Sequence, residues 1–256
     1  MLIILSPTKT FASKATLFKE DFTLPAHLNK SQILINELKM KTIDELIKLM
    51  NISPKLAQLN FERFQQWNKT FNSDNSQQAI FAYRGEVFNG LDAETLKDSD
   101  IMFAQKHLII ISGLYGTLRP LDLIQPYRLE MGTKASFAGR KNLYEFWKET
   151  ITESLQQALK AQNDNILINL ASNEYFKAID TKELNARIIT PHFKENKNGV
   201  YKIVTIYAKK ARGMMTRFIL QNRISDPEQI KLFDLDGYYY NDLLTISPNN
   251  PVFTRN

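Results

Sequence analysis

The sequence predicts an α/β fold (α+β mixed) in one compact domain over residues 1–256, with a mixed sheet surrounded by helices. Short apolar runs alternate with segments of helical period, an order typical of sheets covered by helices. Three runs, at residues 1–5, 107–111 and 166–170, are apolar at most positions, as in strands buried on both faces. Because 43% of the residues are hydrophobic and no linker is evident, one sizeable core is expected.

The remaining elements follow from the same periodicities. Residues 29–67 have the helical period, with breaks near residues 41 and 51. A β-hairpin is predicted around Asn198 and Gly199, because both residue types tolerate the positive φ of a tight reversal. Its two arms are placed at residues 186–192 and 200–206. Further helices are predicted at residues 76–88, 100–106, 142–162 and 207–223.

Composition excludes several classes of protein. The net charge of +6 suits an anionic partner. The chain has no cysteine, which excludes a disulfide scaffold, a thiolate nucleophile and a Cys-rich zinc site. Its three histidines lie far apart, so we expect no metal site and no cofactor. No apolar run reaches the length of a membrane span, so we expect a cytoplasmic protein with no membrane partner.

The predicted helix over residues 207–223 carries charges of one sign. A helical wheel gathers apolar residues on one side and cations on the other. No Asp or Glu in the segment neutralises them, although surface helices usually mix signs. The pattern favours a phosphate-binding face; the alternatives are a solvated charged face or a helix on a membrane surface. The cations are Lys209, Lys210, Arg212, Arg217 and Arg223.

Each of the three apolar runs leads directly into a polar, turn-rich segment. Because the carboxyl ends of parallel strands meet at one edge of a sheet, we expect these segments to line one crevice. The alternative is three ordinary loops. The predicted lining is Lys9, Tyr115, Arg119, Asn169 and Ser172.

The segment after the second run, residues 113–130, is the most restrained, with two glycines and two prolines. Arg119 and Arg128 could clamp phosphates through their planar guanidinium groups. They could equally pair with Asp122 and Glu130 in structural ion pairs, and the sequence leaves both possibilities open.

Residues 42–57 have the pattern of a helix, a tight hairpin and a second helix. They resemble the helix-hairpin-helix motif, although residues 51–53 are Asn-Ile-Ser instead of the usual glycine, hydrophobic residue and glycine. Pro54, Lys55 and Ala57 fit the motif. Its second helix directs backbone amides at a DNA phosphate, which gives binding without base preference. An ordinary helical hairpin is the alternative.

Several motifs, in order along nearly the whole chain, together resemble one known family. They are Ser6-Pro-Thr-Lys-Thr10, Tyr83-Arg-Gly-Glu-Val87, residues 112–122, Pro126-Tyr-Arg-Leu-Glu-Met131, Asn169-Leu-Ala-Ser172 with Glu174-Tyr175, and Tyr207-Ala-Lys-Lys-Ala-Arg-Gly213 with Arg217. The family is the YaaA family of bacterial peroxide-stress-resistance proteins. The resemblance implies a compact α/β domain with a positively charged cleft and a helix-hairpin-helix element. It also implies DNA binding without strong sequence preference, and protection against peroxide through less reactive iron and less oxidative DNA damage.

The resemblance also implies which residues bind DNA phosphates. They are Lys9, Lys55, Arg84, Tyr115, Arg119, Arg128, Lys209, Lys210, Arg212 and Arg217. Non-specific DNA binding alone does not explain the polar residues predicted at the crevice, which are Asn169, Ser172, Glu174 and Tyr175. The alternative function is therefore an enzyme acting on a nucleic acid or a phosphorylated small molecule. The candidate acid-base groups are Glu86, Asp122, Glu130 and Glu174, but they form no recognisable nucleophile-base pair, so no catalytic residue is assigned.

Overall fold

The computed structural model of the chain describes residues 1–13, 18 and 21–256. Its central sheet comprises β1 (Leu2–Leu5), β5 (Leu108–Ser112), β6 (Gly116–Leu118), β8 (Ile166–Asn169) and β9 (Arg187–Ile189). The strand order is β6-β5-β1-β8-β9, with β1 parallel to both β5 and β8. The three apolar runs are therefore neighbouring parallel strands, and their carboxyl ends meet at one edge as predicted.

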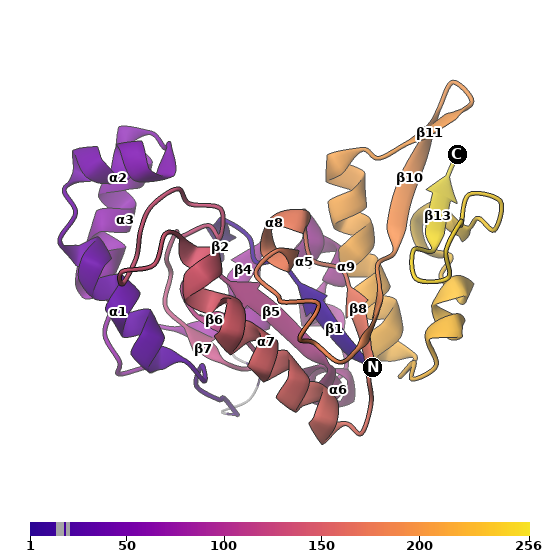
Figure 1. Cartoon of the computed structure of the whole chain (residues 1–256), viewed down its shortest axis with the longest axis horizontal. Helices are drawn as coiled ribbons and strands as arrows, with labels where there is room; N and C mark the ends of the chain where they lie inside the picture. Colours follow the sequence, from indigo (N-terminus) through magenta and orange to yellow (C-terminus); the bar gives the residue numbers. More distant parts are fainter. Residues whose placement is uncertain (14–17, 19–20) are drawn as a thin grey trace.

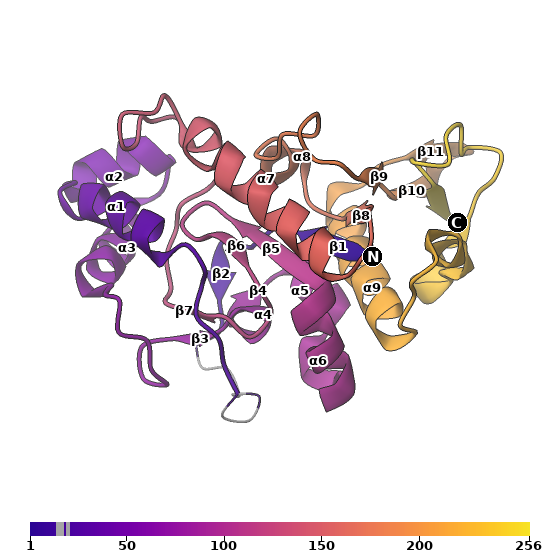
Figure 2. The ribbon, with the colours of Figure 1, turned by 60° about the horizontal axis from the view of Figure 1, so that its bottom comes forward.

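Helices cover both faces of this sheet (Figures 1 and 2). On one face lies α7 (Leu143–Ala161). On the other face lie α5 (Glu86–Leu91), α6 (Asp98–His107) and α9 (Thr205–Gln221). All four residues of β1 are buried, which explains why its sequence is apolar throughout. The α/β fold class is confirmed.

Two glycines let α5 and α9 approach each other closely. A Cβ atom on Gly213 of α9 would lie 1.8 Å from the carbonyl oxygen of Val87, and one on Gly90 of α5 would lie 2.1 Å from that of Lys210. Both distances are far below van der Waals contact, so only glycine fits at either position. This packing fixes the position of α9 beside α5 and beside the edge of the sheet.

A helical lobe forms one end of the molecule, and its helices are labelled at the left of Figure 1. It contains α1 (Leu28–Lys39), α2 (Ile43–Met50) and α3 (Pro54–Gln66), so residues 29–67 break where the sequence predicts. Asn51 ends α2 with a φ of 50°, the left-handed conformation that asparagine tolerates. Ser53 is extended, with a φ of −66°, and its side chain caps α3. The absence of the two usual glycines therefore does not prevent a tight hairpin.

A second sheet stands at the other end of the molecule. Its strands are β10 (His192–Lys197), β11 (Val200–Lys202), β12 (Tyr239–Tyr240) and β13 (Val252–Arg255), in the order β11-β10-β13-β12. The turn between β10 and β11 contains Asn198 and Gly199, both with positive φ, as predicted. The 3₁₀ segments Pro227–Leu232 and Leu235–Gly237 pack beside this sheet. Stacked and edge-on aromatic rings, including Phe193, Phe233 and Phe253, fill its core.

Two predicted elements are wrong. The single helix expected over residues 76–88 is divided into β3 (Gln77–Gln78), α4 (Ala79–Ala82), β4 (Tyr83–Arg84) and α5. The backbone there pairs with β7 (Leu123–Ile124) and β2 (Thr10–Phe11), and Gly85, with a φ of 133°, separates β4 from α5. The predicted first hairpin arm, residues 186–192, instead supplies β9 to the central sheet. In both cases strand pairing with distant segments overrides the local pattern.

The remaining short elements are the 3₁₀ turn Ala93–Thr95 and α8 (Asn173–Phe176), which follows β8 directly. No helix in the described part of the chain is long and apolar enough to cross a bilayer.

Candidate nucleic-acid interface

A crevice of about 610 Å³ opens where β1 and β8 end. The first half of α9 forms part of its lining, and so do Thr8 and Thr10, which follow β1. It combines several of the predicted residues: Lys9, Arg84, Ser172, Glu174, Tyr175, Lys209 and Arg212. The prediction of a crevice at the strand ends therefore describes a real cavity.

Hydrogen bonds between two serines join the strand ends below the crevice. The Oγ atom of Ser6, just after β1, accepts a hydrogen bond from the backbone N–H of Ser172 at 2.7 Å. The same oxygen lies 3.2 Å from the Ser172 hydroxyl. These bonds fix the start of α8 against the end of β1, and they place two hydroxyl groups on the lining of the cavity.

The carboxylate of Glu130 gathers two of the predicted cations. It lies 2.6 Å from the Lys9 ammonium and 3.2 Å from a terminal nitrogen of Arg128. Arg128 is largely buried and does not line the crevice. Arg84 is bound to Glu94 at 2.5 Å and to two backbone carbonyl oxygens. Lys9, Arg84 and Arg128 are therefore held in internal ion pairs. This is the structural role that the sequence left open for Arg119 and Arg128.

Distant elements provide partners for three of the five cations in the predicted helix over residues 207–223. Lys210 pairs with Asp236 at 3.4 Å, and Arg223, just beyond the helix, pairs with Asp100 at 3.0 Å. Arg217 donates hydrogen bonds to the carbonyl oxygens of Leu91 and Asp92, at 3.1 and 2.8 Å, which end α5. The segment lacks acidic residues, but the folded protein supplies them, so the helix does not present one continuous basic face.

Lys209 and Arg212 are the two cations of α9 that line the crevice. Within the described residues neither of them forms an ion pair. Lys209 is exposed, whereas Arg212 is half-buried. Burial lowers the pKa of the Arg212 guanidinium, and no neighbouring carboxylate offsets this effect. The two side chains that remain available to an anion therefore lie side by side on one wall.

Three of the five residues predicted to line the crevice do not line it. Tyr115 is fully buried, and its hydroxyl accepts a hydrogen bond from the Trp67 indole at 3.0 Å and donates one to the carbonyl oxygen of Gln125. Asn169 is buried and organises the chain after β8 by accepting from the N–H of Ala171. Arg119 pairs with Asp122 away from the cavity. The sequence shows that these residues follow strands, but only the structure shows which way each side chain points.

Tyr175 lies at the bottom of the crevice and is 8% exposed. Burial, then the nearby Tyr127 and Glu174, raise the pKa of its phenol well above the usual value. Burial likewise raises the pKa of Tyr127 to about 12. Both phenols therefore stay protonated at neutral pH and can donate hydrogen bonds.

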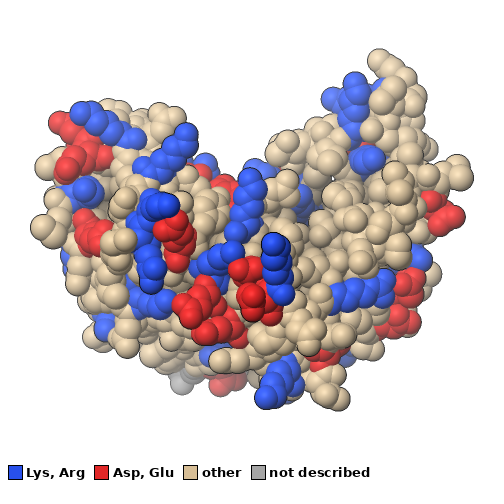
Figure 3. Space-filling model, viewed as in Figure 1, with Lys and Arg blue, Asp and Glu red and all other residues tan. Residues whose placement is uncertain are grey.

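A second cavity, of about 430 Å³, continues the crevice toward the helical lobe. Both cavities are lined by Glu130 and Glu174, so they adjoin. Its other walls are the end of α2, including Lys48 and Asn51, and the segment 132–134. Together the two cavities form one groove between α9 and the helical hairpin. Figure 3 shows the surface hollowed between the two ends of the molecule, with Lys and Arg side chains on its floor and walls.

The groove is more basic than acidic: six Lys and Arg residues and three Glu residues line it. Two of these cations, Lys48 and Lys134, were not predicted from the sequence, and neither forms an ion pair with any described carboxylate. Lys48 lies within the helix-hairpin-helix pattern, which could have indicated it. Lys55, at the start of α3, is exposed and equally unpaired within the described residues, four positions beyond the hairpin residue that lines the groove.

The sequence model of one family, described as peroxide stress protein YaaA, matches residues 1–244 of the 256. The chain belongs to this family. The match includes both walls of the groove, from the hairpin to α9, and leaves out only the last strand and the turn before it. The YaaA resemblance read from the motifs is therefore confirmed.

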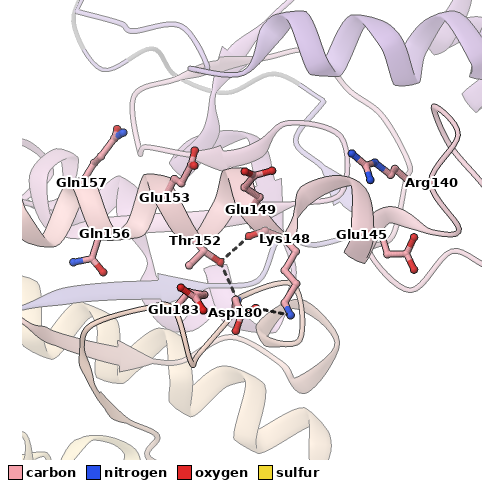
Figure 4. A pocket seen from close by; sticks show the side chains of 10 residues that line it. All are labelled: Arg140, Glu145, Lys148, Glu149, Thr152, Glu153, Gln156, Gln157, Asp180 and Glu183. Carbon is pink, nitrogen blue, oxygen red and sulfur yellow. Dashed lines mark hydrogen bonds and ion pairs between the residues drawn. The ribbon is translucent and has the colours of Figure 1, made fainter.

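A larger cavity, of about 890 Å³, lies elsewhere on this YaaA-family chain and differs in charge (Figure 4). It lies along the outer face of α7, where five carboxylates and only two cations line it. Lys148 is paired with Asp180 at 2.6 Å. Because the remaining carboxylates would repel phosphates, the groove is the better candidate for an anionic partner. No set of three or more His, Asp or Glu side chains within the described residues could hold a metal ion.

Proposed function

We propose that this chain binds duplex DNA in the groove, with little base preference, as part of the peroxide stress response. In this proposal, DNA binding limits iron-dependent oxidative damage to the DNA. The observation that carries the proposal is the row of exposed, unpaired lysines from the hairpin to α9: Lys48, Lys55, Lys134 and Lys209.

Lysines without carboxylate partners suit a phosphate backbone. No internal ion pair has to break before they bind, and counterions released from DNA add a favourable entropy. Lysine ammonium groups are point charges that read no base pattern, so contacts of this kind fix position without selecting sequence. The hairpin adds the backbone N–H of Lys55 in the first turn of α3 for one further phosphate, since Pro54 has no N–H and the N–H of Leu56 is bonded to the Ser53 side chain.

The first test is a salt titration of binding to a short fluorescent duplex. The logarithm of the affinity should fall linearly with the logarithm of salt concentration, with a slope of about −0.9 for each phosphate neutralised. Two duplexes of unrelated sequence should bind with affinities that agree within about threefold, because backbone contacts carry no sequence information. A protein that fails to bind at low salt, or binds independently of salt, would falsify the proposal.

The second test uses one charge reversal on the helical hairpin beside the groove and one far from the groove. Lys55→Glu should weaken duplex binding and leave folding intact, because a carboxylate in the first turn of α3 suits the helix dipole. Lys160→Glu is the control for net charge: Lys160 is exposed in the last turn of α7, near the edge where β8 begins and away from the crevice. Because a carboxylate there opposes the helix dipole, circular dichroism first checks that both variants are folded. Equal losses of affinity in both variants would mean that only net charge matters.

The link to peroxide resistance is tested in cells. A strain that carries the double variant Lys134→Glu and Lys209→Glu should lose both DNA binding and survival under peroxide. If survival persists after binding is lost, DNA binding is not the protective activity.

A further inference from the structure

The crevice contains two opposite charges that do not pair with each other. Arg212 on α9 and Glu86 in the first turn of α5 line the same cavity. The backbones of their helices are in direct contact, because Gly213 faces Val87. Even so, neither side chain forms an ion pair or a side-chain hydrogen bond with any described residue. A folded protein rarely leaves a half-buried guanidinium without a carboxylate partner while an unpaired carboxylate lines the same cavity, since both groups are costly to desolvate.

This arrangement suits a ligand with two kinds of group. Arg212 needs an anion, and the oxygens of a phosphate can accept hydrogen bonds from both terminal nitrogens of a guanidinium. Glu86 can only accept hydrogen bonds when ionised, so it needs a hydroxyl or an amino group on the same ligand. Hydroxyl groups of Ser6, Ser172 and Thr205 also line the cavity. The rest of the polar lining is mixed in charge and includes Lys9, Arg84, Lys209, Glu130 and Glu174, with Thr8, Thr10 and Asn173. The cavity, at about 610 Å³, falls within the usual size range of small-molecule sites.

The deepest lining residues are out of reach of a duplex. Ser6 and Tyr175 are each 8% exposed, whereas the lysines proposed to bind DNA are exposed. A double helix on the groove would therefore contact its rim and leave the crevice unfilled.

We propose that the crevice binds a phosphorylated small molecule of mononucleotide size, with its phosphate on Arg212 and a hydroxyl or amino group on Glu86. The exposed Lys209 lies at the rim of this site and belongs to the proposed DNA contacts, whereas Arg212 and Glu86 do not, so the inference does not depend on DNA binding.

The test is calorimetric titration of the intact protein with the four ribonucleoside 5′-monophosphates, ribose 5-phosphate, adenosine and inorganic phosphate. At least one phosphorylated compound should bind, and adenosine should bind at least tenfold more weakly than AMP if AMP is that compound. A ligand present at one hundred times its Kd should raise the Tm by about 5–10 °C. The proposal is wrong if no organic phosphate binds, or if inorganic phosphate binds as tightly as the best of them.

Three variants locate the site. Thr205→Trp places a large ring on an exposed residue that lines the crevice, and it should abolish ligand binding. Ile206→Trp is the matched control, because Ile206 is 53% exposed and outside the lining, and its affinity should stay within about twofold of wild type. Arg212→Met should weaken binding at least tenfold without lowering the Tm, since it removes an unpaired half-buried charge. A fall in Tm with unchanged affinity would show that Arg212 is structural and overturn the proposal.

Duplex binding separates this inference from the proposed function. Thr205→Trp should bind duplex DNA as wild type does. If the folded variant binds neither the phosphorylated compound nor duplex DNA, the crevice is part of the DNA-binding surface, and the proposal of a small-molecule site is wrong. Failure of the wild-type protein to bind DNA would refute the proposed function alone.

Discussion

Substitutions of Arg217 and Lys209 test whether these two cations of α9 have different roles, one in stability and the other in DNA binding. Both belong to the same helix and carry the same charge, so each change to Met removes one positive charge from one element. In Arg217→Met, two hydrogen bonds to the carbonyl oxygens that end α5 are lost, at 2.8 and 3.1 Å. Lys209→Met removes an exposed ammonium group that has no partner in the described chain.

The two expected magnitudes follow from these contacts. The Arg217 side chain is 20% exposed, so we discount its two charged hydrogen bonds to a total of about 2 kcal/mol of unfolding free energy. For a chain of this length, that loss lowers the Tm by about 4–8 °C. Lys209→Met should leave the Tm within about 1 °C, because exposed unpaired charges contribute little to stability. It should instead reduce the slope of log affinity against log salt by about 0.9, which is about an eightfold loss of DNA affinity near 0.1 M salt.

Thermal unfolding followed by circular dichroism and a salt titration by fluorescence anisotropy, on the same two proteins, measure both quantities. The distinction between the cations fails if Arg217→Met lowers the salt slope without lowering the Tm. It also fails if Lys209→Met destabilises the fold and binds DNA as wild type does.

Further predictions concern packing, burial and pH. Gly213→Ala should lower the free energy of unfolding by about 3 kcal/mol, because its Cβ would lie 1.8 Å from the Val87 carbonyl oxygen. A free energy from denaturant unfolding that stays within about 0.5 kcal/mol of wild type, the size of a neutral change, would contradict this. Tyr115→Phe should lower the free energy of unfolding by about 1–3 kcal/mol, because the Trp67 indole N–H loses its acceptor. The affinity for duplex DNA should not change. Burial lowers the pKa of all three histidines, so the folded state binds fewer protons than the unfolded state as pH falls through about 6.5. The Tm should therefore fall between about pH 7.5 and pH 5.5, and a Tm that rises on acidification would refute the assignment.

The sequence alone determined the parts of the fold that local pattern controls. The apolar runs became adjacent parallel strands because continuous hydrophobicity requires burial on both faces, and only the middle of a covered sheet provides it. The helical hairpin followed from its helical period and the break near residue 51, and Asn51 adopts the positive φ that the turn requires. The crevice was predictable as well, since the carboxyl ends of neighbouring parallel strands must lie together.

Only the tertiary structure decided which charges are available. The helix at residues 205–221 contains no acidic residue, yet Asp236, Asp92 and Asp100 reach its cations and those just beyond it from elements far away in the sequence. Ion pairs form wherever the packing of distant elements places a carboxylate, and no periodicity within the helix records those partners. The close packing of Gly213 against α5 turns Lys209 and Arg212 toward the strand ends, and so selects the two cations that line the crevice.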